Sequence, residues 1–188
     1  TLRTISGDGF FYFNTHGGGG HDRSGRKLYA MGSSTVVTDA NERLPEIAED
    51  LDNDRLVYMT ARNGEFVAGI PKVDTRYAIT RFFVEEYWSF AQNSIVFLNV
   101  CHSALDHDDI HAFVFEVHRA GAGVYFGWSG SVSATGGFRA VRYLVDRLLG
   151  ANEFQPESPK QRPFTWPLVL QDMASKGYTT DGAAQLVT

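Results

Sequence analysis

Hydrophobic residues along the chain fall into short apolar runs that are separated by amphipathic stretches. The runs Gly9–Asn14 (GFFYFN), Asn93–Cys101 (NSIVFLNVC) and Gly123–Trp128 (GVYFGW) are apolar at successive positions. Strands that are buried on both faces have this pattern, so we predict that these runs form strands of a mostly parallel sheet.

Amphipathic stretches lie next to these runs. Residues 109–122 and 134–152 place apolar side chains at helical spacing, and Gly150 is suited to end the second helix. Segment 74–91 also has aromatic residues at helical intervals, which predicts a helix capped by one of its first two residues. Strands and helices are therefore expected to alternate along the chain.

Strands are also predicted for 27–38 (KLYAMGSSTVVT) and 55–61 (RLVYMTA). We expect these lateral strands to form a separate structure beside the main sheet. Turns are expected at 39–42 (DANE) and 62–65 (RNGE).

The alternation of apolar strands and helices predicts an α/β fold in which helices cover both faces of the sheet. We expect a single domain over residues 1–188, with a core at about 9–151 and a C-terminal extension at 152–188. Within the extension, proline-rich residues 153–167 are expected to be irregular and to precede a short helix at 168–176.

Composition narrows the possible functions. Apolar residues make up 43% of the chain and charged residues 21%, as in packed globular proteins. A net charge of -5 gives no basic surface for nucleic acid, and no apolar run approaches the roughly 20 residues that span a bilayer. The chain has one cysteine and therefore no internal disulfide, which favours a reducing compartment such as the cytoplasm.

No cofactor or metal is expected. Because the sequence starts at Thr1 without a leader, we expect a processed product or a piece of a longer protein.

Reactive side chains follow two of the predicted strands directly. His16 comes after the first strand and opens the run HGGGG, and Cys101 ends the second. Because ligands of parallel α/β sheets bind at the carboxyl ends of the strands, these two residues are candidates for one site. An imidazolium beside a thiol lowers the thiol pKa from about 8.5 and yields a nucleophilic thiolate.

A serine esterase of the HGGG type is the less favoured alternative. It needs a Gly-x-Ser-x-Gly elbow followed later by a histidine, but Gly127–Ser131 (GWSGS) lacks the final glycine. The last histidine, His118, precedes Ser129. The cysteine interpretation finds all the groups that it requires.

The strand that ends in His16–Gly17 and the strand that ends in Cys101 resemble the two core motifs of caspase-like cysteine peptidases. Segment 99–104 (NVCHSA) is similar to the corresponding segment of metacaspases, and 120–132 (AGAGVYFGWSGSV) to a strand of CHAT and gingipain-like enzymes. The resemblance implies a three-layer αβα sandwich with a mostly parallel sheet. Family members have further strands before the His-Gly strand, so the first strands of that fold are expected to be missing here.

The resemblance also implies residue roles in a cysteine endopeptidase that acts on a protein or peptide. Cys101 would be the nucleophile and His16 the base, with the N–H groups of Gly17 and Cys101 as the oxyanion hole. Asn99, Trp128 and Ser129 would line the pocket for the substrate residue before the scissile bond, the P1 residue. Asn99 stands where metacaspases have an aspartate, so a basic P1 residue would need Asp106, Asp108 or Asp109, and an uncharged one Asn99 and Trp128.

Other interpretations remain open. A catalytically silent scaffold of the same fold is the main alternative. The histidines His102, His107 and His111 lie among aspartates, and such a group of side chains suggests a metal site. A solvated loop is the favoured interpretation. The polar loops 21–27 and 158–163 are candidate sites of self-cleavage, and a preceding segment or regulatory domain of the same protein is a candidate partner.

Overall fold

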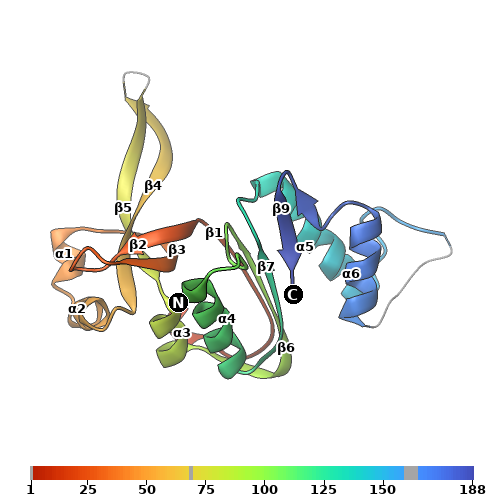
Figure 1. Ribbon diagram of the computed structural model, residues 1–188, viewed down its shortest axis with the longest axis horizontal. Helices are drawn as coiled ribbons and strands as arrows, with labels where there is room; N and C mark the ends of the chain where they lie inside the picture. Colours follow the sequence, from red (N-terminus) through yellow and green to blue (C-terminus); the bar gives the residue numbers. More distant parts are fainter. Residues whose placement is uncertain (1, 68–69, 159–164) are drawn as a thin grey trace.

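A central sheet and a small barrel organise the protein (Figure 1), whose computed structural model describes residues 2–67, 70–158 and 165–188, without the side chains of 61–73. The strands of the sheet lie in the order β1 (Ser6–Thr15), β6 (Ser89–Val100), β7 (Ala122–Trp128), β9 (Ala184–Val187) and β8 (Thr180–Asp181). β1, β6 and β7 are parallel, whereas β9 is antiparallel to β7. The three predicted apolar segments are confirmed as strands, but β1 is the edge strand and has no buried residue, so its predicted burial on both faces is wrong.

Helices cover both faces of the sheet (Figure 1), with α3 (Arg81–Tyr87) and α4 (Asp108–Arg119) on one face and α5 (Ala134–Leu149) and α6 (Trp166–Ser175) on the other. Successive residues of β6 serve opposite faces: Leu98 belongs to the apolar cluster that includes Phe113 of α4, and Phe97 to the cluster that includes Leu144 of α5. The molecule is therefore an α/β sandwich with a mixed sheet. Within the described residues, no helix is long and apolar enough to cross a bilayer.

The small barrel is inserted between β1 and β6 along the chain. It closes in the order β2 (Gly17–His21), β3 (Lys27–Val36), β5 (Ile70–Ile79) and β4 (Leu56–Val67). A 3-10 helix, η1 (Leu2–Thr4), precedes β1, and the helices α1 (Asp39–Glu42) and α2 (Pro45–Asp52) connect β3 to β4. The two predicted lateral strands are confirmed as β3 and β4.

The predicted helix over residues 74–91 is wrong in its first and last parts, because α3 covers only Arg81–Tyr87 and β6 begins at Ser89. β5 continues to Ile79, and α3 follows only after Thr80, whose hydroxyl accepts a hydrogen bond from the Phe82 N–H (3.2 Å). Tyr77 of β5 is almost fully buried, as is its neighbour Ala78. Because both faces of this strand are covered, it lacks the polar alternation that marks a half-exposed strand.

Both predicted turns in this region are also wrong. Residues 39–42 form α1, which Thr38 caps by accepting a hydrogen bond from the Asn41 N–H (3.1 Å). Residues 62–65 lie inside β4, which pairs with β5 on both sides of a register shift. Long-range pairing has overridden the local turn preference of these residues.

The C-terminal residues take part in the core on the α5 face. Val169 and Met173 of α6 and Ala184 and Leu186 of β9 belong to one apolar cluster with Trp128. The predicted short helix is confirmed as α6, and residues 153–158 have no helix or strand, as expected. Of the candidate cleavage loops, 159–163 lie outside the described residues, whereas residues 22–26 form the turn between β2 and β3.

Candidate active site

His16 and Cys101 follow the paired ends of β1 and β6. The last paired positions are Thr15 and Val100, so the next residue on each strand is His16 and Cys101. Asn14 and Asn99 lie two residues before His16 and Cys101, and the Asn99 side chain donates a hydrogen bond to the Asn14 side chain at 3.0 Å. Side chains two positions apart in a strand lie on the same face, which directs His16 and Cys101 to the α5 face of the sheet.

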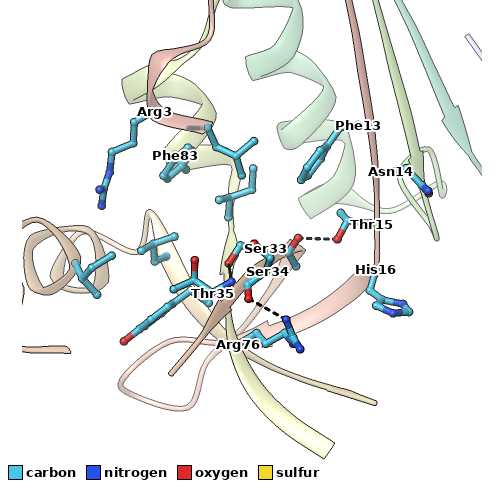
Figure 2. Close-up of a pocket in the computed structure, with 16 residues that line it drawn as sticks. Arg3, Phe13, Asn14, Thr15, His16, Ser33, Ser34, Thr35, Arg76 and Phe83 are labelled. Carbon is cyan, nitrogen blue, oxygen red and sulfur yellow. Dashed lines mark hydrogen bonds between the residues drawn. The ribbon is translucent and has the colours of Figure 1, made fainter. Parts of the chain in front are cut away.

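Figure 2 agrees with this assignment for β1. It shows Asn14 and His16 on one side of the strand and Phe13 and Thr15 on the other. The His16 side chain is exposed, and Cys101 is half-buried and a free thiol. The two candidate residues therefore lie at neighbouring strand ends on one face of the sheet.

Gly17 packs directly against the backbone of Cys101. A Cβ atom at Gly17 would lie 2.3 Å from Val100 Cγ1 and 2.5 Å from the Cys101 carbonyl oxygen. This close approach requires glycine. The hydroxyl of Tyr29 also donates to the Cys101 carbonyl at 3.2 Å, and burial raises the pKa of Tyr29 well above 10.0, which keeps this donor protonated.

The N–H of Gly17 points away from β3. The Gly32 N–H donates to the His16 carbonyl (2.8 Å), so His16 and Gly32 are a hydrogen-bonded pair of the antiparallel ladder. The next pair, Gly17 and Met31, is then a non-hydrogen-bonded pair. β2 pairs with β4 only at His21, so among the described residues no strand is paired with the other side of Gly17.

The chain turns sharply after Cys101. His102 has φ of 60°, a left-handed conformation that is uncommon for a residue other than glycine and is often found at functional sites. Its N–H donates to the Gly130 carbonyl (2.9 Å), and its Nε2 lies 3.0 Å from Ser131 Oγ. The other ring nitrogen is buried with no hydrogen-bond partner, so this Ser-His pair lacks the orienting carboxylate of a serine hydrolase triad.

A loop at 129–133 contacts the thiol. The Val132 N–H donates to Cys101 Sγ (3.4 Å), and Sγ donates to the Val132 carbonyl (3.6 Å). The C-terminal hairpin of β8 and β9 holds both ends of this loop. Ser129 and Gln185 exchange two hydrogen bonds (2.8 and 2.9 Å), and the Ser133 N–H donates to the Asp181 carboxylate (2.5 Å). The hairpin thus fixes the backbone N–H that faces the sulfur.

We expect Asp181→Ala to slow alkylation of Cys101 by iodoacetamide at pH 7 about tenfold. The loop would lose its anchor at Ser133, and a lost hydrogen bond to a charged sulfur is worth about 1.5 kcal/mol. Asp181→Asn keeps an acceptor oxygen and should alkylate at nearly the wild-type rate. Equal rates in all three proteins would contradict a role for the hairpin in positioning the loop.

Asn99 and Trp128 lie beneath α5. Asn99 is 3% exposed and Trp128 0%, and the indole N–H donates to Asn99 Oδ1 at 3.0 Å. A Cβ atom at Gly137 of α5 would lie 2.0 Å from that oxygen, so the helix is closely packed on Asn99. Direct contact of either side chain with a substrate would require α5 to move. Ser129, in contrast, is half-buried in the loop that contacts the thiol.

The aspartates after Cys101 differ in their surroundings. Asp106 is exposed and pairs with His111 Nε2 (3.1 Å), and Asp108 is exposed in the first turn of α4. Asp109 accepts a hydrogen bond from the Tyr29 N–H of β3 and so ties α4 to the barrel. Asp106 and Asp108 are therefore available to a ligand, whereas Asp109 is engaged.

Two of the histidines that suggested a metal site have other hydrogen-bond or ion-pair partners besides each other: His107 and His111. His107 caps α4, because its Nδ1 accepts a hydrogen bond from the Asp109 N–H (3.2 Å). Among the described residues, no three His, Cys, Asp or Glu side chains come together as a metal site.

Several contacts of the site were missed by sequence reasoning. Tyr29, Val132, Asp181 and Gln185 act through backbone groups or across long sequence separations, and none belongs to a motif that signals them.

Neither the scan of family models nor the searches of curated proteins and solved structures found a match to this chain.

Proposed function

We propose that the protein is a caspase-like cysteine endopeptidase that uses Cys101 as nucleophile and His16 as base. The observation that carries this proposal is the register of β1 and β6, which brings both residues to adjacent strand ends on one face. The α/β sandwich with parallel β1, β6 and β7 supports it as well. A reducing compartment such as the cytoplasm, where Cys101 stays a free thiol, is part of the proposal.

In the proposed reaction, His16 takes the thiol proton of Cys101, and the thiolate attacks the carbonyl carbon of the scissile peptide. The carbonyl oxygen becomes an oxyanion that the N–H groups of Gly17 and Cys101 stabilise. The orientation of the Gly17 N–H away from β3 and the close approach of Gly17 to the Cys101 backbone support this role.

The tetrahedral intermediate then collapses. The C–N bond breaks, and His16 gives its proton to the leaving amine, which leaves an acyl group on the sulfur. Water attacks this thioester with His16 as base, releases the new carboxyl terminus and restores the thiol. The Val132 N–H at 3.4 Å from Sγ would stabilise the thiolate before attack and after release.

Within this proposal, a basic P1 side chain is favoured over an uncharged one. Asp106 and Asp108 are exposed carboxylates shortly after the nucleophile, whereas Asn99 and Trp128 are buried under α5. A preceding segment or regulatory domain of the same protein remains a candidate partner.

A catalytically silent scaffold is the second candidate function. Among the described residues, the hydrogen-bond partners of the thiol are the N–H and carbonyl of Val132 rather than His16. Catalytic hydrogen bonds often tighten only when substrate binds, so this geometry is compatible with both functions.

Labelling with a peptidyl acyloxymethyl ketone, followed by cleavage of a peptide library, distinguishes the two functions. A peptidase should label at Cys101 far faster in the folded protein than after denaturation, and Cys101→Ala should not label. If folded and denatured wild type label at the same rate and no library peptide is cut, the scaffold is the correct function.

A further inference from the structure

A pocket of about 700 Å³ lies between β1 of the sheet and the barrel strands β3 and β5 (Figure 2). Its volume is within the range of about 300–1,000 Å³ that is typical of small-molecule sites. Phe13 and Thr15 face it from β1, on the opposite side of that strand from the His16 imidazole (Figure 2). The pocket therefore adjoins the candidate active site: His16 lines its edge, whereas Cys101 is not among the described residues that line it.

The two ends of this pocket differ in chemistry. Six of the lining side chains are large and apolar: Leu2, Phe13, Ile47, Leu56, Ile79 and Phe83. Figure 2 shows Phe13 and Phe83 at one end, with Arg3 beside Phe83, and Ser33, Ser34 and Arg76 at the other. None of the described residues that line the pocket is acidic. A ligand with an apolar body and an anionic end would match both parts.

Arg76 supplies the charge at the polar end. Its Nη1 donates to the Ser34 carbonyl (2.9 Å), which fixes the guanidinium. Among the described side chains, Arg76 forms an ion pair with Asp74, whose carboxylate oxygen is 3.6 Å from Nη2, beyond hydrogen-bond distance. A guanidinium has five N–H donors, so a ligand carboxylate could still be bound by this group. The other arginine at the pocket, Arg3, already donates from Nε to Asp50 at 3.0 Å.

The backbone of β3 is irregular beside Arg76. Pairing with β5 shifts from Gly32 opposite Ala78 to Val36 opposite Arg76, so residues 33–35 have no paired residue on β5. The Ser33 hydroxyl accepts a hydrogen bond from the Thr35 N–H (3.1 Å). Bulges of this kind are frequent next to binding sites, and here the bulge brings hydroxyl groups to the polar end.

We propose that this pocket binds a carboxylate attached to a large apolar group, with Arg76 on the carboxylate and the apolar end around the ligand body. Two sources have this chemistry: a free aromatic or medium-chain acid, and the C-terminal residue of a peptide that ends in a large apolar side chain. The inference does not depend on the proposed peptidase activity, because Arg76 and the apolar side chains that would hold the ligand have no part in that reaction, although His16 lies at the edge of the pocket.

Isothermal titration calorimetry with three probes tests the proposal in wild type and in the Cys101→Ser protein. The probes are 4-phenylbutyrate, its uncharged amide, and the peptide acetyl-Ala-Ala-Phe with a free carboxyl terminus. We expect 4-phenylbutyrate to bind about tenfold or more tightly than the amide, and equally well in both proteins. Tighter binding of the peptide than of 4-phenylbutyrate would identify a peptide end as the source, and the reverse order a free acid.

Arg76→Gln should remove the preference for the acid over the amide, with a loss of affinity of about ten- to a hundredfold. Arg142→Gln is the matched control, because Arg142 is exposed on α5 on the other face of the sheet. Arg76→Lys keeps the charge and should bind with intermediate affinity, and circular dichroism checks that each variant is folded. A change in the His16 ring signals by NMR would locate the ligand, since His16 lies at the edge of the pocket.

Equal affinity for acid and amide, or an unchanged acid affinity in folded Arg76→Gln, would overturn the proposal.

Discussion

Cys101→Ala is expected to abolish peptide cleavage, and His16→Ala should reduce kcat/KM on the order of a thousandfold or more. In the proposed reaction the thiol forms the covalent bond, and without the imidazole it would lose both its base and the acid that protonates the leaving amine. Because the two side chains would act in one proton transfer, the double variant should be little worse than either single one. The measurement is kcat/KM for a peptide selected from the library.

His107→Ala is the control for this experiment. His107 caps α4 and is exposed, so its loss should leave kcat/KM nearly unchanged at a small cost in stability. Circular dichroism and the thermal midpoint establish that each variant is folded. Losses that simply multiply in the double variant would show that His16 and Cys101 act independently, and full activity in His16→Ala would exclude the histidine as base.

The sequence was informative where a strand carries an unbroken apolar run. In β6 and β7 most residues of this run are buried, whereas β1 carries an apolar run although it is the edge strand and has no buried residue. The residues that follow β1 and β6 could be placed at one edge of the sheet from the order of residues alone. The long amphipathic helices α4 and α5 were predictable for a related reason, because a single apolar face has a clear period.

The barrel was less predictable because its signals are non-local. β2 consists of four glycines and His21, and glycines carry no hydrophobic pattern. Glycine is required at position 20 by a spatial neighbour: a Cβ atom there would lie 2.4 Å from Val57 Cγ2 of β4, a residue far away in the sequence. The short hairpin of β8 and β9 is similar, since its strands are too brief for any periodicity to show.

The candidate site shows the same division. Sequence position alone could nominate His16 and Cys101, because each follows a strong strand. The surroundings of Asn99 and Trp128 could not be foreseen, since the close packing of α5 on Asn99 depends on Gly137, whereas the adjacent Gly136 packs against Asp181. A pair of helical glycines lowers helix propensity and gives no direct indication of what packs against it.

Gly17→Ala is expected to damage both the stability and the reactivity of the site. Its methyl group would lie 2.3 Å from Val100 Cγ1 and 2.5 Å from the Cys101 carbonyl oxygen, distances that real structures do not tolerate. β2 would have to move away from the end of β6. Overpacking of this kind costs about 1–3 kcal/mol, and for a chain of this size each kcal/mol lowers Tm by about 2–4 °C.

The same displacement would move the Gly17 N–H away from the substrate carbonyl that Cys101 would attack in the proposed reaction. Loss of one oxyanion donor lowers kcat about a hundred- to a thousandfold, so the effect on peptide cleavage should exceed the effect on stability. Gly18→Ala is the matched control, because a Cβ atom at the adjacent position meets no heavy atom within 4 Å. It should retain wild-type Tm and kcat/KM. Cleavage by Gly17→Ala at the wild-type rate, in protein with a lowered Tm, would show that Gly17 matters only for packing, and the oxyanion role would then have to be assigned to other donors.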